Sequence, residues 1–140
     1  MAQMPDRADI VVIGAGVVGN AAVSHLAELG WRNIVQLDKG PLPDPGGSTG
    51  HASNFVFPVD HSKEVTDLTV DSIRQYQQLG VLDDCGGIEV ALSAERMQEL
   101  TRRMTSALSW GVEAELLSPA EIQQLVPHCD AGLLIGGFHT

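Results

Sequence analysis

Three glycines near the start of the chain have the spacing of a dinucleotide-binding turn. Gly14, Gly16 and Gly19 form a G-x-G-x-x-G pattern directly after the apolar residues 10–13. The first glycine permits a sharp exit from a strand, the second leaves room for a pyrophosphate, and the third lets a helix pack closely on the strand. The N–H groups that open this helix carry partial positive charge. The pattern therefore predicts a dinucleotide site at residues 14–19.

An acidic residue follows at the distance expected for a ribose contact. Asp38 comes at the end of the next apolar run, about 20 residues after the glycine turn. Its carboxylate can accept hydrogen bonds from an adenosine ribose and would repel a 2′-phosphate, which disfavours NADP. The alternative is an acidic side chain that only faces solvent at the end of a strand. The glycine turn and Asp38 together do not distinguish an FAD site from an NAD site.

A loop of small residues that contains a histidine comes next. Residues 46–52 read Gly-Gly-Ser-Thr-Gly-His-Ala. Small residues let a backbone lie flat against a planar ligand, and the hydroxyls of Ser48 and Thr49 can bond to phosphate or ring atoms. The neutral imidazole of His51 can act as a nucleophile. The alternative is an ordinary loop histidine with no chemical role.

The elements that would position these residues form a βαβ unit. Residues 10–13 read as a strand buried on both faces, and a helix follows up to residue 29. Gly30 stands where the C-terminal end of that helix belongs, and residues 33–37 read as a second strand. Two strands joined by a helix predict a parallel sheet. Residues 40–54, which include Pro43 and Pro45, read as a functional loop or, alternatively, an interdomain linker.

The second half of the chain predicts a mixture of helices and strands. The predicted helices are 65–79, 97–107 and a short one that a capping box opens at 118–121; the predicted strands are 87–92 and 133–138. Ser93 and Gly80 are the expected helix caps. We expect an α/β protein with a Rossmann-like FAD-binding βαβ unit and flavin loop in residues 1–60. Residues 61–140 would begin a mixed α+β substrate or cap region and read as truncated.

Composition and charge exclude several classes of partner. Eighteen acidic residues against eight basic ones give a net charge of −10, which disfavours nucleic-acid binding. No apolar run approaches the roughly 20 residues of a membrane span. The first residues lack a basic segment followed by an apolar one, so we expect no secretory signal, and the strand-like run that begins at about Ile10 disfavours a mitochondrial leader. Cys85 and Cys129 have no metal-like spacing. We expect a cytoplasmic protein with reduced thiols and no metal site, and the oligomeric state stays open.

Three stretches of the chain resemble the dimethylglycine dehydrogenase/oxidase and sarcosine dehydrogenase family. They are VVIGAGVVG at 11–19, LDKGP at 37–41 and GSTGHA at 47–52. Similar segments at 86–91, 110–111 and 117–121 extend the resemblance over nearly the whole chain. Its most specific element is the Ser-Thr-x-His-Ala loop. The family belongs to the D-amino-acid-oxidase-like FAD-dependent oxidoreductases.

The resemblance implies FAD as the cofactor and assigns residues to it. The implied cofactor-binding residues are Gly14, Gly16, Val17, Val18, Gly19, Asp38, Lys39, Gly47, Ser48, Thr49, Gly50, His51 and Phe55. Val17 and Val18 would lie beside the pyrophosphate, and His51 matches the histidine that bonds covalently to the flavin 8α-methyl carbon. The chain departs from the family at Asn54 and Phe55, where relatives often have glycine and an aliphatic residue. Asn54 can keep the left-handed turn that a glycine would allow.

The resemblance also implies an activity. It predicts the N-terminal FAD-binding part of an enzyme that oxidises the C–N bond of a small methylated amine or amino acid, similar to dimethylglycine or sarcosine. No residue of this chain is a catalytic acid or base, so we expect the isolated chain to be inactive. The alternatives are a truncated, non-catalytic dinucleotide-binding module and an NAD-dependent enzyme, although the latter leaves the histidine loop without a role.

Overall fold

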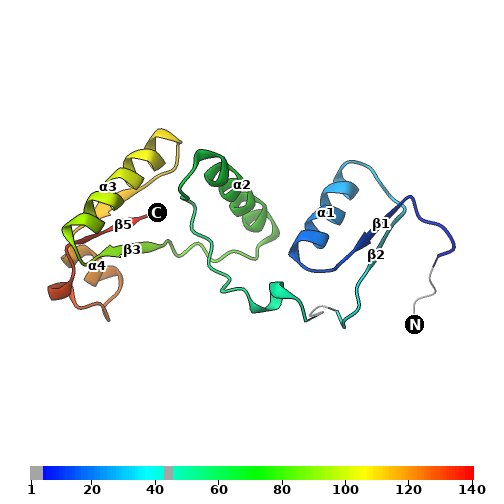
Figure 1. The fold of residues 1–140 in the computed structure, drawn as a ribbon, viewed down its shortest axis with the longest axis horizontal. Helices are drawn as coiled ribbons and strands as arrows, with labels where there is room; N and C mark the ends of the chain where they lie inside the picture. Colours follow the sequence, from blue (N-terminus) through cyan, green and yellow to red (C-terminus); the bar gives the residue numbers. More distant parts are fainter. Residues whose placement is uncertain (1–4, 43–45) are drawn as a thin grey trace. The chain divides into compact units, whose positions relative to one another are not determined.

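The computed structural model describes residues 5–42 and 46–140 (Figure 1). Pro43 and Pro45 of the predicted loop, and the first four residues, lie outside the described residues. The chain divides into two compact units, with the division between Phe55 and Val56. Each unit has its own sheet, so each can be described by itself.

The first unit contains the predicted βαβ arrangement. Strand β1 (Ile10–Ile13) is followed by helix α1 (Val17–Glu28) and strand β2 (Ile34–Leu37). The two strands pair in parallel, with Val12 opposite Gln36. A one-turn 3₁₀ helix, η1 (Ser48–His51), forms inside the segment predicted to be an irregular loop. The parallel pair places the ends of β1 and β2 at the same edge of the sheet.

Helix α1 ends in a Schellman motif, which confirms the role predicted for Gly30. Gly30 has a φ of +98°, and its N–H donates to the carbonyl of Ala27 at 3.0 Å. The N–H of Trp31 donates to the carbonyl of Leu26 at 3.1 Å. These two bonds satisfy carbonyls that the end of a helix leaves unpaired.

The prediction that strand β1 is buried on both faces is wrong for this structure. Its side chains alternate, and Val11 and Ile13 are 54% and 86% exposed. Successive side chains of a strand point to opposite faces, and the sheet of the first unit has only two strands with α1 packed against them. Within the described part of this unit, no second layer covers the face of Val11 and Ile13.

The second unit contains an antiparallel sheet on which two of its helices, α3 and α4, pack. Its elements are α2 (Lys63–Leu79), β3 (Ile88–Ala91), α3 (Ala94–Ser109), β4 (Glu115–Leu117), α4 (Pro119–Leu125), η2 (Ala131–Leu133) and β5 (Gly136–His139). The strand order is β3-β5-β4. The sequence prediction missed β4 and began the last strand too early. Asp130 accepts a hydrogen bond from the N–H of Gly132 and turns that segment into the 3₁₀ helix η2.

The helix ends of the second unit follow the predicted local signals. The Ser93 side chain accepts from the N–H of Arg96 at 3.2 Å and caps α3. Ser118 and Glu121 form the predicted capping box at the start of α4. Gly80 adopts a φ of +67° and ends α2. Each signal involves residues within four positions of one another, so it does not depend on contacts with distant parts of the chain.

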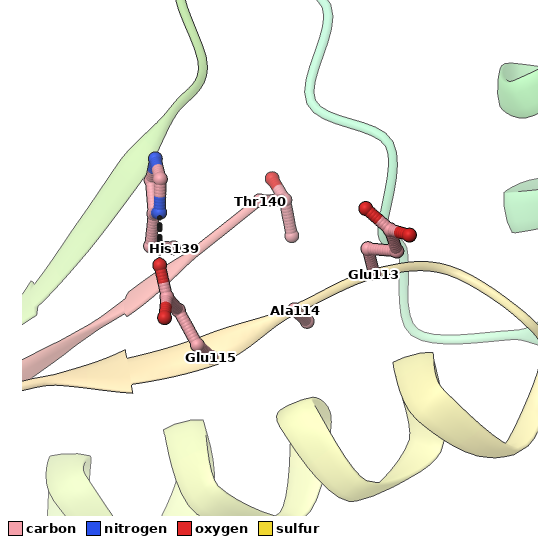
Figure 2. Close-up of a pocket in the computed structure, with 5 residues that line it drawn as sticks. All are labelled: Glu113, Ala114, Glu115, His139 and Thr140. Carbon is pink, nitrogen blue, oxygen red and sulfur yellow. Dashed lines mark hydrogen bonds and ion pairs between the residues drawn. The ribbon is translucent and has the colours of Figure 1, made fainter.

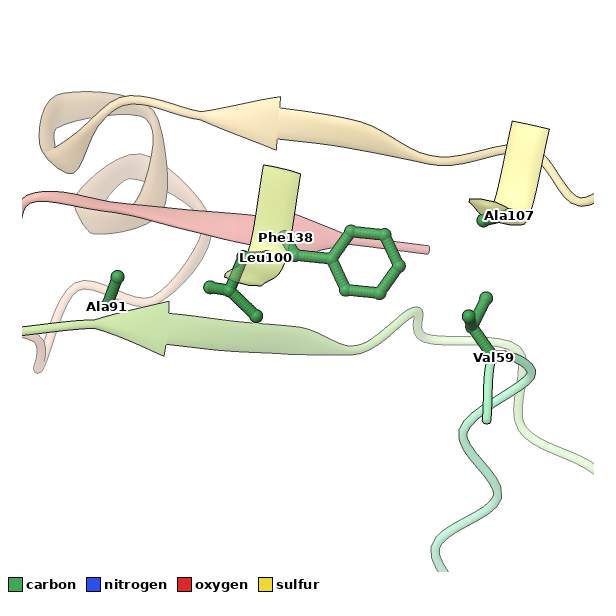
Figure 3. Packing of buried hydrophobic residues seen from close by; sticks show 5 residues of the cluster. All are labelled: Val59, Ala91, Leu100, Ala107 and Phe138. Atoms are coloured by element: carbon green, nitrogen blue, oxygen red, sulfur yellow. The ribbon is translucent and has the colours of Figure 1, made fainter. Parts of the chain in front are cut away.

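The core of the second unit lies between α3 and the sheet. Figure 3 shows five of its buried residues: Val59, Ala91, Leu100, Ala107 and Phe138. Leu100 and Phe138 are fully buried, and Phe57 packs edge-on against the Phe138 ring at 5.6 Å. Phe57 and Val59, which follow the predicted flavin loop, therefore belong to this core.

Arg103 connects the segment that contains Phe57 and Val59 to the rest of the second unit. Its guanidinium donates to a carboxylate oxygen of Glu89 at 2.5 Å and to the carbonyl of Val59 at 2.9 Å. The same group lies 5.9 Å and 5.5 Å from the ring centroids of Phe57 and Phe138. An arginine in this position combines charge pairing with stacking on aromatic faces.

Replacing Arg103 by methionine should destabilise the second unit. The change removes the bonds to Glu89 and Val59 and leaves the Val59 carbonyl unpaired, which should lower the free energy of unfolding by about 2 kcal/mol. Urea denaturation followed by circular dichroism measures this loss. The matched control is the neighbouring, exposed Arg102→Met, which should change it by less than about 0.5 kcal/mol. Equal effects of the two substitutions would show that Arg103 contributes no more than a surface arginine.

Candidate functional site

The glycine turn joins β1 to α1 and requires glycine for steric reasons. Gly14 has a φ of +113°, which side chains rarely allow. A Cβ atom at Gly19 would overlap the carbonyl group of Gly14. Helix α1 therefore approaches the end of β1 as closely as backbone atoms permit. A Cβ atom at Gly16 would lie 3.0 Å from the Thr49 hydroxyl oxygen, so a side chain here would require Thr49 to shift.

Both carboxylate oxygens of Asp38 accept backbone hydrogen bonds, and one of these bonds comes from the glycine turn. Its Oδ2 accepts from the N–H of Ala15 at 2.7 Å, and its Oδ1 accepts from the N–H of Gly40 at 2.9 Å. The N–H groups of Gly40 and then Ala15 hold the pKa of the Asp38 carboxyl below its ordinary value, because they stabilise the charged form. The sequence predicted Asp38 as a ribose contact, and the structure brings it to the glycine turn.

The first N–H groups of helix α1 include free donors. The residue that precedes the helix is Gly16, which has no side chain to cap it. The N–H of Val17 donates to the Thr49 hydroxyl at 2.9 Å. Among the described residues, none accepts a hydrogen bond from the N–H of Gly16 or Val18. These donors, with the positive end of the helix dipole, can bind an anion.

The histidine loop is attached to this helix end. Thr49 lies in η1, and its bond to Val17 holds that turn at the start of α1. His51 follows two residues later in η1 and is exposed. No described residue forms a hydrogen bond or ion pair with its imidazole. The structure thus places the histidine loop and Asp38 next to one glycine turn.

The remaining predicted residues lie on the exposed parts of the same unit. Gly47 precedes η1, and Ser48 and Gly50 are exposed within it. Lys39 is exposed beside Asp38, and Phe55 is 62% exposed. Asn54 has a φ of +58°, so it keeps the left-handed turn expected at this departure from the family.

Sequence reasoning missed two amide side chains that contact the turn. Gln36 Nε2 donates to the carbonyl of Gly14 at 2.9 Å and to Asn20 Oδ1 at 3.0 Å. Asn20 Nδ2 donates to the carbonyl of Ala15 at 3.2 Å. The available signal was a single polar residue, Gln36, inside the otherwise apolar run 34–37.

A pocket of about 330 Å³ lies in the second unit and is separate from these residues (Figure 2). Its lining is Glu113, Ala114, Glu115, His139 and Thr140. The His139 ring pairs with the Glu115 carboxylate at 3.0 Å, as Figure 2 shows. None of the predicted cofactor residues lines it. Within residues 5–42 and 46–140, no group of three metal-ligating side chains gathers, and no helix has the length and apolarity to cross a bilayer.

Removing the Thr49 hydroxyl should release the histidine loop from α1. Thr49→Val keeps the shape of the side chain but cannot accept from Val17, so exchange of the Val17 amide hydrogen should quicken by about fivefold, the equivalent of about 1 kcal/mol. Hydrogen exchange read by NMR measures it. Ser48→Ala removes a neighbouring hydroxyl and should leave Val17 unchanged. Exchange at Val17 that is the same in Thr49→Val and the parent would show that this bond does not hold the loop.

The contact between Asp38 and Ala15 should depend on pH. Since the folded-state pKa of Asp38 is lowered, the contact is fully present above the ordinary carboxyl pKa and is lost as the pH falls through the lowered value. The amide proton shift of Ala15 should therefore titrate with a midpoint below that of an aspartate in an unstructured peptide. Asp38→Asn should abolish this titration, whereas the exposed Asp83→Asn should preserve it. A midpoint at or above the peptide value contradicts the contact.

Comparison with known proteins identifies a family and several relatives that this chain resembles. Residues 9–140 match the family described as DAO, FAD dependent oxidoreductase. Mitochondrial dimethylglycine dehydrogenase of Rattus norvegicus is 30% identical over 142 residues, which are 96% of this chain and 16% of that protein. Mitochondrial sarcosine dehydrogenase of Homo sapiens is 30% identical over 146 residues, with coverage of 98% and 16%. The chain therefore spans about a sixth of the length of these curated relatives.

A solved structure shows the same fold. The crystal structure of L-proline dehydrogenase from P. horikoshii superposes with a TM-score of 0.88 at 21% identity. The match covers 98% of this chain and 37% of that one. The expected α/β class with a parallel βαβ unit is confirmed by this likeness and by the parallel pair of β1 and β2. Because the family match extends over residues 9–140, the chain belongs to the FAD dependent oxidoreductase (DAO) family.

Proposed function

We propose that this chain is the N-terminal FAD-binding part of an enzyme that oxidises the C–N bond of a methylated amine or amino acid. The observation that carries the proposal is the convergence of Asp38 and Thr49 on the glycine turn at the start of α1. These residues come from three separate segments of the sequence. In this proposal residues 1–60 hold the cofactor, and residues 61–140 begin the substrate or cap region.

The adenosine diphosphate half of FAD fits the donors of the glycine turn. The N–H groups of Gly16 and Val18 would donate to phosphate oxygens, with Val17 and the backbone at Gly14 and Gly19 shaping the site. Each Asp38 oxygen already accepts one N–H and keeps a second lone pair for a ribose hydroxyl. The negative charge of Asp38 disfavours a 2′-phosphate. Lys39 would lie at the same ribose.

The flavin ring would lie along the histidine loop. Gly47 and Gly50 leave space for a planar group, Ser48 and Thr49 supply hydroxyls, and Phe55 follows at the end of the loop. The His51 imidazole is exposed and has no described partner that would hold it away from a ligand. A covalent bond would join an imidazole nitrogen to the flavin 8α carbon as the methyl C–H and imidazole N–H bonds break. Dissolved oxygen would take up the two electrons and two protons that this bond formation releases.

When bound, FAD would supply the redox chemistry by accepting a hydride from the carbon next to the amine nitrogen. Water would hydrolyse the resulting iminium product. The names of the relatives, dimethylglycine dehydrogenase and sarcosine dehydrogenase, favour a small methylated amino acid as substrate. Both names include the word mitochondrial, and a cytoplasmic location for this chain stays a prediction. We assign no catalytic acid or base to the chain, so these groups would come from other parts of the complete protein.

Acid denaturation tests the cofactor and its attachment together. Protein expressed from its own gene and saturated with FAD should keep flavin fluorescence on its band after acid denaturation, because His51 holds the ring covalently. His51→Ala should still bind FAD but release it into the acid supernatant. His128→Ala, another exposed histidine, is the matched control and should keep the flavin.

The possible outcomes separate the parts of the proposal. Complete loss of flavin from the wild-type protein would exclude the covalent bond but not FAD binding. A wild-type protein that binds no FAD before denaturation would overturn the function and favour a non-catalytic module. Oxidation of sarcosine or dimethylglycine, followed with an artificial electron acceptor, then tests the substrate class.

A further inference from the structure

Two side-chain amides hold consecutive carbonyl groups of the glycine turn. Gln36, in β2, donates to the Gly14 carbonyl at 2.9 Å, and Asn20, in α1, donates to the Ala15 carbonyl at 3.2 Å. The second hydrogen of the Gln36 amide goes to Asn20 Oδ1 at 3.0 Å. Both donor hydrogens of Gln36 are thus used, and the two side chains form one connected unit.

Because the peptide bond is planar, a contact that holds a carbonyl group also fixes the direction of the N–H group that follows it. In a trans peptide the C=O and the following N–H point to opposite sides. With the Gly14 carbonyl held by Gln36, the N–H of Ala15 faces the other way, where it meets Asp38 Oδ2 at 2.7 Å. With the Ala15 carbonyl held by Asn20, the N–H of Gly16 is likewise turned away from Asn20. The N–H of Gly16 is one of the donors from which no described residue accepts a hydrogen bond.

The turn needs such a constraint because glycine provides little of its own. Gly14 and Gly16 flank Ala15, and glycine occupies both signs of φ at similar cost. A rotation of the Ala15–Gly16 peptide would present a carbonyl oxygen where the N–H now lies. An oxygen there would repel a phosphate instead of binding it. Fixing the Ala15 carbonyl therefore prevents the one local change that would reverse the charge presented to the ligand.

Each of the two amide side chains lies at a position where it lowers the stability of the fold unless it forms hydrogen bonds. Gln36 interrupts an apolar strand and is half-buried, so its amide requires partners. Asn20 lies inside the first turns of α1, where asparagine is a weaker helix former than alanine. Their mutual bond joins β2 to α1 across the turn.

We infer that Gln36 and Asn20 are positioning residues for a diphosphate. They hold the Gly14–Ala15–Gly16 backbone so that the free N–H of Gly16 is presented to phosphate oxygens. The inference rests on the proposed function, since it concerns the cofactor that the turn would bind. It adds two side chains that never touch the ligand but set the orientation of the group that does.

The test compares ADP with adenosine, which has the same ribose but no phosphate. The 140-residue chain is titrated with each ligand and followed by NMR, because we expect its affinity to be weaker than micromolar. Gln36→Met should raise the Kd for ADP about tenfold and change that for adenosine less than twofold, because only the phosphate contact depends on the turn. In the free chain, exchange of the Ala15 amide hydrogen should quicken.

Two further variants keep the test decisive. Asn20→Ala replaces an exposed residue by a better helix former, so it should fold, and it should show the same selective loss of ADP. Gln123→Met is the matched control, because the Gln123 amide also donates to a backbone carbonyl, that of Cys129 at 3.1 Å, but in the second unit. It should leave both affinities unchanged.

The outcomes distinguish this inference from the proposed function. If the wild-type chain binds ADP and both site variants bind it equally well, the inference alone is overturned. Equal losses for ADP and adenosine would also overturn it, because they would mean a structural role without selectivity for phosphate. If the wild-type chain binds neither ADP nor FAD, the proposed function fails and this inference fails with it.

Discussion

The close approach of helix α1 to the end of strand β1 determines the geometry of the first unit. Gly19 lies so near the Gly14 carbonyl that no side chain fits between them. This contact fixes where the helix begins relative to the sheet. Because β1 and β2 run in parallel, Asp38 comes out at the same edge and reaches the N–H of Ala15. The candidate site is a consequence of one backbone contact and the parallel direction of two strands.

The polar contacts around the turn each have a distinct role. Asp38 and the amides of Gln36 and Asn20 bond to the turn itself, whereas Thr49 bonds to the first turn of the helix. Together they leave a small number of N–H groups without a protein acceptor. Since an unpaired backbone donor is costly when water is excluded, a bound anion would complete the hydrogen bonding of this helix end. The second unit shares none of these contacts and is stabilised by its own aromatic core around Phe138.

Features with a local physical cause could be predicted from the sequence. The glycine turn, the Gly30 helix end and the Ser118 capping box each depend on residues within a few positions of one another. The family resemblance likewise rested on short motifs, and the family match over residues 9–140 confirms it. The left-handed conformation of Asn54 could be predicted because the family often has glycine at this position and asparagine tolerates that conformation.

Features that depend on distant partners could not be predicted in the same way. Strand β4 has only three residues and exists because it pairs with β5, which follows much later in the chain. The exposure of Ile13 depends on how many strands the sheet has, which periodicity does not report. The bond between Gln36 and Asn20 requires the strand and the helix to be packed first. All three features depend on how strands and helices pair or pack with one another. A local sequence pattern does not contain that information.

The attachment of the histidine loop through Thr49 has a kinetic consequence. His51 lies two residues after Thr49, whose hydroxyl accepts from Val17 at the start of α1. A cofactor bound at that helix end would therefore be held by the same protein molecule that carries the proposed nucleophile, the His51 imidazole. Under the proposed function, bond formation is then intramolecular, with a high effective concentration of imidazole. The rate of covalent bond formation would rise with the FAD concentration until the site is saturated. Above that concentration the rate would stay constant, as expected for a unimolecular step.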